Sequence, residues 1–339
     1  MTRMAPPAPP AQAATTPPVA NRPKRSVAPY FMVAPLLIVL GVVLLIPLVR
    51  LVIVSLQDYG LDQIIGGKPT AWVGLSNYVD VLTADQFWSS LWTTLQFVVA
   101  SVALTIGLGL LLAHLLAKVS GWVRVIMLIA LVTVWATPPI IAMPIWRWLI
   151  DQRFGVLNYA LYKVGLLPTR TFNWFSEPLT GWLVITAIVV WGALPFVVIS
   201  LHAALTSVSN ELVEAARLDG AGAWKVFTTV TLPAIRSTLM IVTTLSIIWN
   251  YRVFAQIWLL RDIGANKDAY YTIGIWSYVE SFSNKNFGYG AAIALISVVL
   301  LAGLSIFAVR SVLRSTAEDT GERIEKAIFR PTDDKAGGK

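Results

Sequence analysis

The stretch from Asn210 to Pro233 holds the most distinctive set of charged, small and turn-forming residues in the chain. It reads NELVEAARLDGAGAWKVFTTVTLP and lies between two long apolar runs. Its apolar positions recur at spacings of three and four as far as Gly220, which predicts a short amphipathic helix. Ser209 or Asn210 is a suitable N-cap for that helix. Residues of these types suit binding to another protein rather than making or breaking bonds.

Two glycines interrupt the pattern. Gly220 and Gly222 predict a break, after which Trp224 and Phe227 belong to a second short helix that ends at Pro233. A helix, a glycine turn and a second helix at a membrane surface suit docking into the groove of a partner protein. The alternative is an ordinary amphipathic helix that lies in the membrane interface.

A second group of polar residues lies inside the apolar run from about 239 to 260. Polar groups are costly in hydrocarbon and mark helix interiors or transport pathways. Aromatic faces combined with amide and guanidinium donors suit hydroxyl-rich rings, so we predict a substrate pathway lined by Asn250, Tyr251, Arg252, Gln256 and Trp258. The alternatives are contacts between helices or side chains that extend to the outer interface. Arg252 could also serve an anionic sugar or pair with an acid of a partner subunit.

The residues needed for catalysis are missing. The chain has no cysteine, and its two histidines, His114 and His202, have no carboxylate or histidine at ligand spacing. The run nearest to a P-loop, residues 62–69, has Asp at the first glycine position and Pro after Lys68. No Gly-x-Ser-x-Gly elbow is present. We therefore expect no catalytic residue, no metal site and no cofactor in this chain, which is not an enzyme by this criterion.

The composition is that of a membrane protein. Of the 339 residues, 56% are hydrophobic and 13% are charged, and the mean hydropathy is +0.69, whereas soluble domains carry about 25% charged residues. The net charge of +8 comes from Lys and Arg at the ends of apolar runs. That distribution is typical of membrane topology signals and not of a nucleic-acid-binding surface.

Six apolar runs are long enough to cross a hydrocarbon core of ~30 Å, which predicts an all-α membrane protein with six spans. The third run contains Pro138, Pro139 and Pro144, so we expect a kink or a break there. The runs cover about 30–56, 91–117, 122–150, 181–205, 239–260 and 288–309.

Charges beside the spans predict the orientation. The first 27 residues carry Arg3, Arg22, Lys24 and Arg25 and no acid, whereas the loop after the first span is acidic. The positive-inside rule then places both termini on the cytoplasmic side of the membrane. We expect a disordered, Pro-rich cytoplasmic tail over 1–27, a transmembrane domain over 28–313 with its core at 91–313, and a cytoplasmic tail over 314–339.

The stretch described first resembles the EAA loop of binding-protein-dependent ABC importer permeases. That signature is Glu-Ala-Ala, three residues, Gly, nine residues, an aliphatic residue, any residue, Leu and Pro. The matching positions, with the Asp-Gly-Ala form common in the sugar branch, are Glu214, Ala215, Ala216, Asp219, Gly220, Ala221, Val230, Leu232 and Pro233.

The resemblance implies a function for this loop. In the family the loop is a coupling helix that seats on the ATP-binding subunit and transmits closure of the ATPase dimer to the spans. It follows that Glu214 is the candidate for the polar contact and Gly220 for the turn, where a side chain would disfavour a positive φ. ATP and Mg²⁺ would then be bound by the partner ATPase and not by this chain.

Other segments are similar to the maltose-type carbohydrate branch. Residues 72–78 look like the external segment that opens the first permease of such a pair, and residues 288–292 resemble the start of the last span. The resemblance implies that 28–313 is a permease domain of the type I importer fold in a bacterial inner membrane. It also implies a second homologous permease, an ATPase dimer, an extracellular solute-binding protein and a sugar as cargo. A sugar phosphate or a polyol is the alternative. A secondary transporter would need intramembrane carboxylates, which the spans lack.

Overall fold

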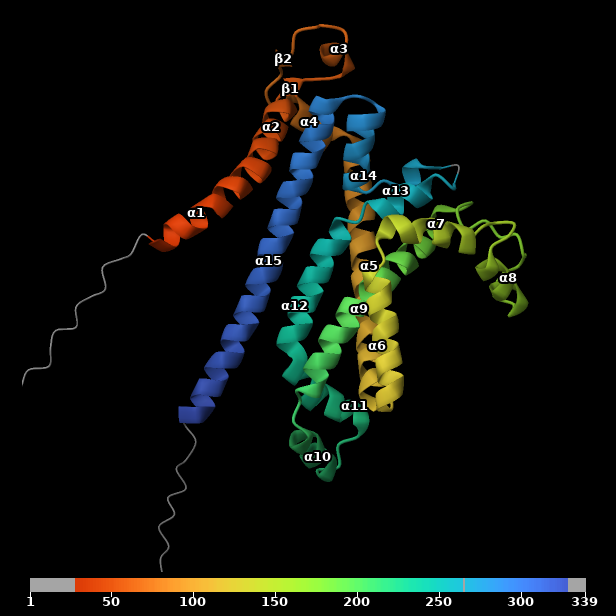
Figure 1. Ribbon diagram of the computed structural model, residues 1–339, viewed down its shortest axis with the longest axis vertical. Helices are drawn as coiled ribbons and strands as arrows, with labels where there is room; N and C mark the ends of the chain where they lie inside the picture. The colour runs from red at the N-terminus through yellow and green to blue at the C-terminus, as the bar shows by residue number, and fades with distance from the viewer. Residues whose placement is uncertain (1–27, 265, 329–339) are drawn as a thin grey trace, which may run out of the picture. The chain divides into compact units, whose positions relative to one another are not determined.

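The computed structural model describes residues 28–264 and 266–328, and these residues are mainly helical (Figure 1). The predicted tail over 1–27 and the last residues of the predicted C-terminal tail, 329–339, lie outside the described residues. The described part of that second tail continues the last helix to Ile328. The chain divides into two compact units at Arg50, and each is described by itself.

The first unit contains the predicted first span. Here α1 (Ala28–Leu40) passes through the π-helical turn η1 (Gly41–Leu45) into α2 (Ile46–Ser55), whose last residues belong to the second unit. Together they give an apolar helix long enough to cross a membrane, over Met32–Ser55.

A small extramembrane segment opens the second unit. Strands β1 (Gln57–Asp58) and β2 (Ala71–Trp72) pair antiparallel with Gln57 opposite Trp72, and α3 (Leu61–Ile64) lies in the connection between them. Helix α4 (Ser76–Thr83) follows. The Asn77 amide donates to the carbonyls of Ser55 and Gln57 at 2.9 and 3.0 Å, which fixes α4 against the start of the hairpin.

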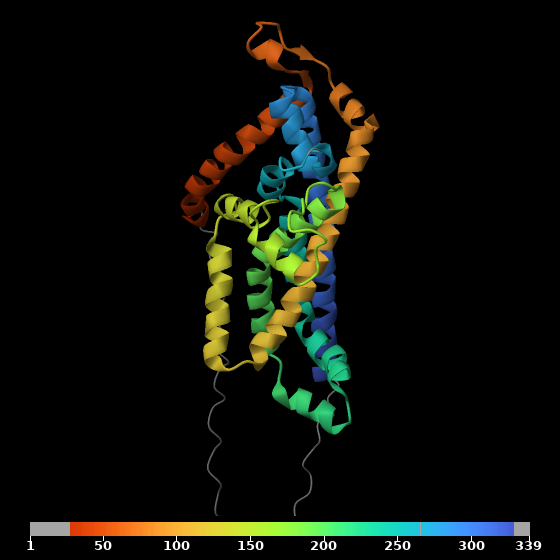
Figure 2. The same cartoon turned by 90° about the vertical axis from the view of Figure 1, so that its right-hand side faces the viewer.

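Long helices form the body of the second unit (Figures 1 and 2). By length and apolarity the described residues contain five helices able to cross a membrane, or six when one bent pair counts as a span. In the second unit these are α5 (Asp85–Lys118), α9 (Pro178–Thr206), the helix that ends as α12 (Leu232–Tyr251), and α15 (Phe287–Ile328). Helices α5 and α9 pack most extensively, and Gly109 of α5 lies against the buried Val197 of α9.

The third predicted span is broken, as its prolines predict. Helix α6 (Gly121–Ala136) ends before Thr137, Pro138 adopts an extended conformation, and α7 (Pro139–Leu149) leaves at an angle of 105°. At 1.5 Å per residue α6 is about 24 Å long, so α6 alone is short for a hydrocarbon core of ~30 Å. The turn to α7 therefore lies within the predicted membrane region.

Two predictions about helix ends are wrong. The fifth span does not continue to residue 260, because α12 ends at Tyr251 and a separate helix, α13 (Ala255–Arg261), follows. The ring of Phe254 stacks on Trp258 at 5.7 Å and packs against Tyr278 at 5.1 Å, and this tertiary packing draws the chain out of the helical path. Hydropathy alone does not reveal such an interruption.

The second helix of the 210–233 stretch does not end at Pro233. Helix α11 (Ala223–Val226) continues through the π turn η2 (Phe227–Thr231) into α12, with Pro233 in the first turn. A proline ring clashes with the carbonyl four residues earlier in a regular α-helix. That carbonyl, on Thr229, lies in the wider π turn, as does the equivalent carbonyl of Val43 before Pro47. Both prolines thus follow a π turn that accommodates them.

Shorter elements complete the unit. They are α8 (Val156–Lys163), α10 (Asn210–Leu218), the 3-10 turn η3 (Asp268–Tyr270), α14 (Ile273–Tyr278) and the π turn η4 (Val279–Ser283). The largest buried cluster joins residues of α5, α7, α9, α13 and α14, and Tyr270 lies within it. A smaller one joins α5, α9 and α12 near the opposite end, with Leu201 at its centre.

Candidate functional site

Helix α10 is short and solvent-exposed. Ser209 occupies the N-cap position, as predicted, although its side chain makes no capping hydrogen bond. Glu211 lies in the first turn and Arg217 in the last, which is the arrangement that the helix dipole favours. The helix contacts α11 and η2. It is therefore a separate element at the end of the spans (Figure 1).

The helix ends in a Schellman turn. The N–H of Ala221 donates to the carbonyl of Ala216, and the N–H of Gly220 donates to that of Arg217, both at 3.0 Å. Gly220 has φ +80°, the left-handed conformation that this motif requires at the residue after the cap. Glycine adopts it without the strain that a Cβ introduces. The spacing between Ala216 and Gly220 is thus the one that the Schellman motif requires at the C-terminus of a helix.

Exposed apolar side chains surround this turn. Leu212, Leu218 and Trp224 are 59%, 89% and 76% exposed. Glu214 is exposed on the same helix and takes part in none of the ion pairs found among the described residues. Large apolar groups that are left uncovered at a structured turn are typical of a binding surface.

The stretch is anchored to the spans through aromatic rings. Val226 is buried, and the ring of Phe227 lies 5.7 Å from Trp224 and 5.4 Å from His114 of α5. The Nδ1 of His114 is 3.0 Å from the Leu110 carbonyl, so this histidine packs within the helix surface. The described residues contain no group of three His, Cys, Asp or Glu side chains placed to hold a metal ion.

The predicted coupling residues divide between two places. Glu214, Ala215 and Ala216 lie on α10, and the turn that follows contains Asp219, Gly220 and Ala221. Leu232 and Pro233 lie at the start of α12, beyond η2. The contact between α10 and η2 brings the two parts near each other.

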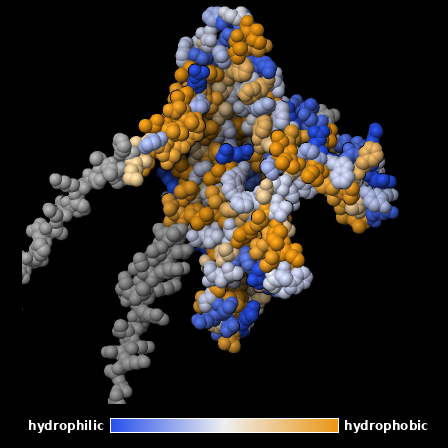
Figure 3. Space-filling view, viewed as in Figure 1, coloured by the Kyte–Doolittle hydropathy of each residue, from blue (hydrophilic) through white to orange (hydrophobic). Residues whose placement is uncertain are grey.

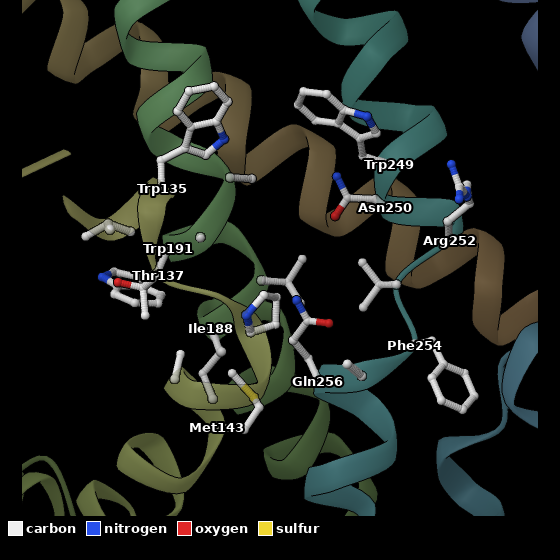
Figure 4. A pocket seen from close by; sticks show the side chains of 18 of the residues that line it. Trp135, Thr137, Met143, Ile188, Trp191, Trp249, Asn250, Arg252, Phe254 and Gln256 are labelled. Atoms are coloured by element: carbon white, nitrogen blue, oxygen red, sulfur yellow. The ribbon is translucent and has the colours of Figure 1, made fainter. Parts of the chain in front are cut away.

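A cavity of about 600 Å³ lies where two helices are interrupted (Figure 4). Its walls come from α6, the bend before α7, the middle of α9, the end of α12 and the start of α13. The break after Ala136 and the break after Tyr251 both open onto it. Backbone that leaves the helical path at membrane depth is tolerated where it lines such a cavity.

Three of the five residues predicted for the substrate pathway line this cavity. They are Asn250, Arg252 and Gln256. The hydroxyl of Tyr251 lies 3.1 Å from Ser297 Oγ of α15, and Trp258 packs against Tyr278 at 4.6 Å. The structure does not bring Tyr251 and Trp258 to the cavity.

Asn250 is the most constrained polar group of the cavity. It is 3% exposed, and its amide nitrogen donates to the Ser246 carbonyl at 2.7 Å. That bond fixes the orientation of the amide, since only the nitrogen can donate, and leaves Oδ1 buried without a partner among the described residues. An unsatisfied buried acceptor costs about 1–3 kcal/mol until a donor reaches it. Figure 4 shows the Gln256 side chain extending into the same space.

Sequence reasoning missed the indole rings of the cavity. Trp135, Trp191 and Trp249 line it together with Thr137 at the bend. The available signal was a tryptophan within an apolar run next to a proline pair or a polar residue, since an indole N–H in hydrocarbon needs a partner. The cavity thus combines flat apolar faces with amide and guanidinium groups.

The family model for binding-protein-dependent transport system inner membrane components matches residues 105–316. The chain belongs to this family. It is 36% identical over 294 residues to the diacetylchitobiose uptake system permease protein DasB of Streptomyces coelicolor, covering 87% of this chain and 89% of that one. It is 33% identical to the trehalose/maltose transport system permease protein MalF of Thermococcus litoralis, covering 82% and 90%.

The fold agrees with that of a solved transporter. A chain in the crystal structure of a bacterial ABC transporter involved in the import of the acidic polysaccharide alginate superposes with a TM-score of 0.70, at 21% identity, over 85% of this chain and 95% of that one. The predicted type I importer permease fold is confirmed by this match. The permease family to which the chain belongs is a transport family and not an enzyme class.

Proposed function

We propose that this permease is the membrane subunit of an ATP-driven importer that carries a carbohydrate delivered by an extracellular solute-binding protein. Its partners are a second, homologous permease and an ATPase dimer, which binds the ATP and Mg²⁺. The permease itself moves solute by alternating access and makes no covalent change to it. The observation that carries the proposal is the exposed helix α10 with its Schellman turn at Gly220.

The proposed docking residues lie on α10 and beside the turn at Gly220. Leu212, Leu218 and Trp224 offer apolar surface, and Glu214 offers a charge that no described residue pairs. A short helix with apolar anchors is a recurring way to fill a groove of a partner protein. On the ATPase, Glu214 meets a donor of opposite charge, and the set from Glu214 to Pro233 transmits the movement.

The side chains that line the cavity support a carbohydrate as the cargo. Indole faces suit the apolar faces of sugar rings, and Asn250 Oδ1 needs a donor such as a sugar hydroxyl. Gln256 and Arg252 supply further donors. The names of the relatives support a carbohydrate, since DasB takes up diacetylchitobiose and MalF transports trehalose and maltose.

The proposed orientation places α10 and both termini in the cytoplasm. The end of the second unit that carries α10 also carries the α5–α6 turn, where Lys118 and Arg124 lie (Figure 2). The opposite end carries the hairpin β1–β2, and α8 lies between the two ends. Basic residues beside the spans at the α10 end agree with the positive-inside rule.

An anionic sugar or sugar phosphate is the second candidate cargo. Arg252 lines the cavity and forms no ion pair with a described carboxylate. An anionic group of the solute could therefore pair with its guanidinium. Secondary transport is disfavoured because the membrane-spanning segments of the described helices, of which the last is Phe287–Leu313, hold no carboxylate for ion coupling apart from Asp85 at the start of α5.

The test uses the complete importer reconstituted in lipid. ATP hydrolysis stimulated by the solute-binding protein is measured with a panel of neutral oligosaccharides, polyols, sugar phosphates and uronic acids. Glu214→Ala is compared with Glu211→Ala, which removes the same charge one helical turn earlier. We expect stimulation by one member of the panel, a loss of about tenfold or more in Glu214→Ala, and little change in Glu211→Ala.

Each part of the proposal can fail separately. Equal effects of the two glutamate changes would remove Glu214 from the docking surface. Stimulation by a uronic acid or a sugar phosphate alone would transfer the cargo assignment to the anionic candidate, with Arg252 as its partner. Absence of stimulation by every sugar in an assembled complex would overturn the carbohydrate assignment.

A further inference from the structure

Helix α8 and the segments on either side of it project from the body of the second unit. Figures 1 and 2 show α8 at the level of the upper end of α6, outside the packed helices. We call this part the α8 surface. It exposes apolar and aromatic side chains between 44% and 77%: Phe154, Val156, Tyr159, Tyr162, Val164 and Leu166.

The α8 surface continues an apolar face of the spanning helices. Helix α8 contacts α7, whose Ile145 and Trp148 are exposed, and the chain returns to the spans through the exposed Leu179 and Leu183 of α9. Residues of this kind at the end of a span lie where hydrocarbon meets headgroups. In Figure 3 the part that projects on the right carries hydrophobic and hydrophilic surface side by side.

Basic side chains gather around one ring of this surface. Lys163 Nζ and Arg170 Cζ lie 5.6 and 5.2 Å from the centroid of the Tyr159 ring. Arg153 and Arg170 line a cavity of about 360 Å³ together with Phe154, Gly155, Val156 and Tyr159. Two guanidinium groups thus share a cavity with apolar and aromatic walls.

None of these three cations forms an ion pair with a carboxylate among the residues that the structure describes. The ion pairs found there involve Lys68, Arg261 and Lys267. The neighbouring acid, Asp151, does not line the cavity, and its Oδ1 accepts the N–H groups of Arg153 and Phe154 at 2.9 and 2.8 Å. The lining of the cavity therefore carries two arginines and no carboxylate.

The cations are held by a rigid support. Asn158 is the fully buried residue of α8; it donates to the carbonyls of Asp151 and Phe172 at 3.2 and 2.8 Å, and accepts the Trp174 Nε1–H at 2.6 Å. This amide therefore connects the chain before α8, at Asp151, with the chain after it, at Phe172. The backbone segments that carry Arg153 and Arg170 are thus held close to each other, which lowers the cost of bringing the two arginines to one ligand.

We propose that the α8 surface binds an anionic membrane lipid, with its phosphate between Arg153 and Arg170 and its acyl chains along the exposed apolar side chains. Guanidinium pairs recognise phosphate, and basic residues at a membrane surface attract anionic headgroups. An acidic soluble partner would use the charges and leave Val164 and Leu166 exposed to water. The lipid uses both features.

The experiment measures lipid bound to the purified full-length chain by native mass spectrometry. Phosphatidylglycerol and phosphatidylcholine of the same acyl length are added at equal concentration. Arg153→Gln/Arg170→Gln is compared with Lys68→Gln/Lys267→Gln, which removes two exposed cations that pair with Asp62 and Asp262. Thermal unfolding of all three chains without lipid identifies any change in folding.

We expect the native chain and the lysine control to prefer phosphatidylglycerol, and the arginine variant to bind it roughly tenfold to thirtyfold more weakly. Unchanged phosphatidylglycerol binding in the arginine variant would overturn the proposal. Equal competition by inorganic phosphate would also overturn it, since the acyl chains would then contribute nothing. Unchanged lipid binding together with weaker docking of the solute-binding protein would reassign the α8 surface to that protein. These outcomes do not depend on which solute the importer carries.

Discussion

Replacing Gly220 with alanine tests whether the turn after α10 carries the coupling. Gly220 has φ +80°, and a Cβ added there would meet no atom within 4 Å. The substitution therefore introduces no steric clash with neighbouring groups and acts through the backbone alone. A left-handed conformation costs a residue with a Cβ about 1–2 kcal/mol. The population of the observed turn then falls by roughly 5- to 30-fold relative to competing conformations.

The same turn contains a matched control. Gly222 lies two residues later, has φ −66° and ψ 166°, and would also meet no atom within 4 Å on gaining a Cβ. Any residue adopts that extended conformation without strain. Gly222→Ala adds the same methyl group to the same exposed segment and is expected to leave coupling almost unchanged. Gly220→Asn should fall between the two, because asparagine tolerates the left-handed region.

The assay is binding of the permease pair to the ATPase dimer, followed by ATP hydrolysis stimulated by the solute-binding protein. We expect Gly220→Ala to weaken docking by up to the factor given above and to lower stimulated hydrolysis, while Gly222→Ala matches the native chain. Equal behaviour of the two alanine variants would refute the reasoning, because it would show that the left-handed turn is not required. A defect confined to Gly222→Ala would refute it as well.

Three further predictions follow from particular contacts. Asn250→Leu removes the unpaired acceptor of the cavity and should lower sugar uptake by about tenfold or more, whereas Tyr251→Phe, whose hydroxyl faces Ser297, should not. Gly109→Ala places a methyl group 2.5 Å from Val197 Cγ1 and should destabilise the α5–α9 pair by about 1–3 kcal/mol in thermal unfolding, while Gly107→Ala, with open space around it, should not. The N–H groups of Phe154 and Arg153 lower the pKa of the Asp151 carboxyl, so its contribution to stability is complete above the ordinary value near ~3.9 and is lost as the pH falls through the lower folded value. The stability difference between the native chain and Asp151→Asn should therefore narrow below about pH 4.

The sequence predicted the spans well because length and apolarity are local properties. It also predicted the break at Pro138 and Pro139, since a missing N–H and a fixed φ act at the residue itself. The end of the fifth span was predicted wrongly, because it depends on contacts between residues that are distant in the sequence. Helix α12 stops at Tyr251 through ring packing of Phe254 with Trp258 and Tyr278, and the last of these is 24 residues beyond Phe254 in the sequence.

The candidate site also has features that the local sequence predicts and features that depend on tertiary structure. The positive φ of Gly220 could be predicted, because a glycine after a short helix is a strong local signal. The sequence identified five polar or aromatic residues in an apolar run as a substrate pathway. Which of them line the cavity, namely Asn250, Arg252 and Gln256, depends on the break after Tyr251. A continuous helix would have given Tyr251 and Trp258 other neighbours. Thr137 lines the cavity at the 105° bend itself.

One helix joins the two candidate sites. From Ala223 beside the turn to Tyr251 beside the cavity, the chain stays helical for 29 residues, a length of about 43 Å at 1.5 Å per residue. A movement of α10 would therefore reach Asn250 through a single rigid element, with only the π turn η2 between them. Because the helix ends at the cavity wall, a small rotation would change which groups line the cavity. Pro233 keeps the π turn in place, since an α-helical turn there would bring its ring against the Thr229 carbonyl. Pro233→Ala should permit that α-helical turn, shift the register of α12 relative to α10 and uncouple ATP hydrolysis from uptake while both partners remain bound. Normal uptake per ATP in that variant would show that the register of α12 is not what couples the two sites.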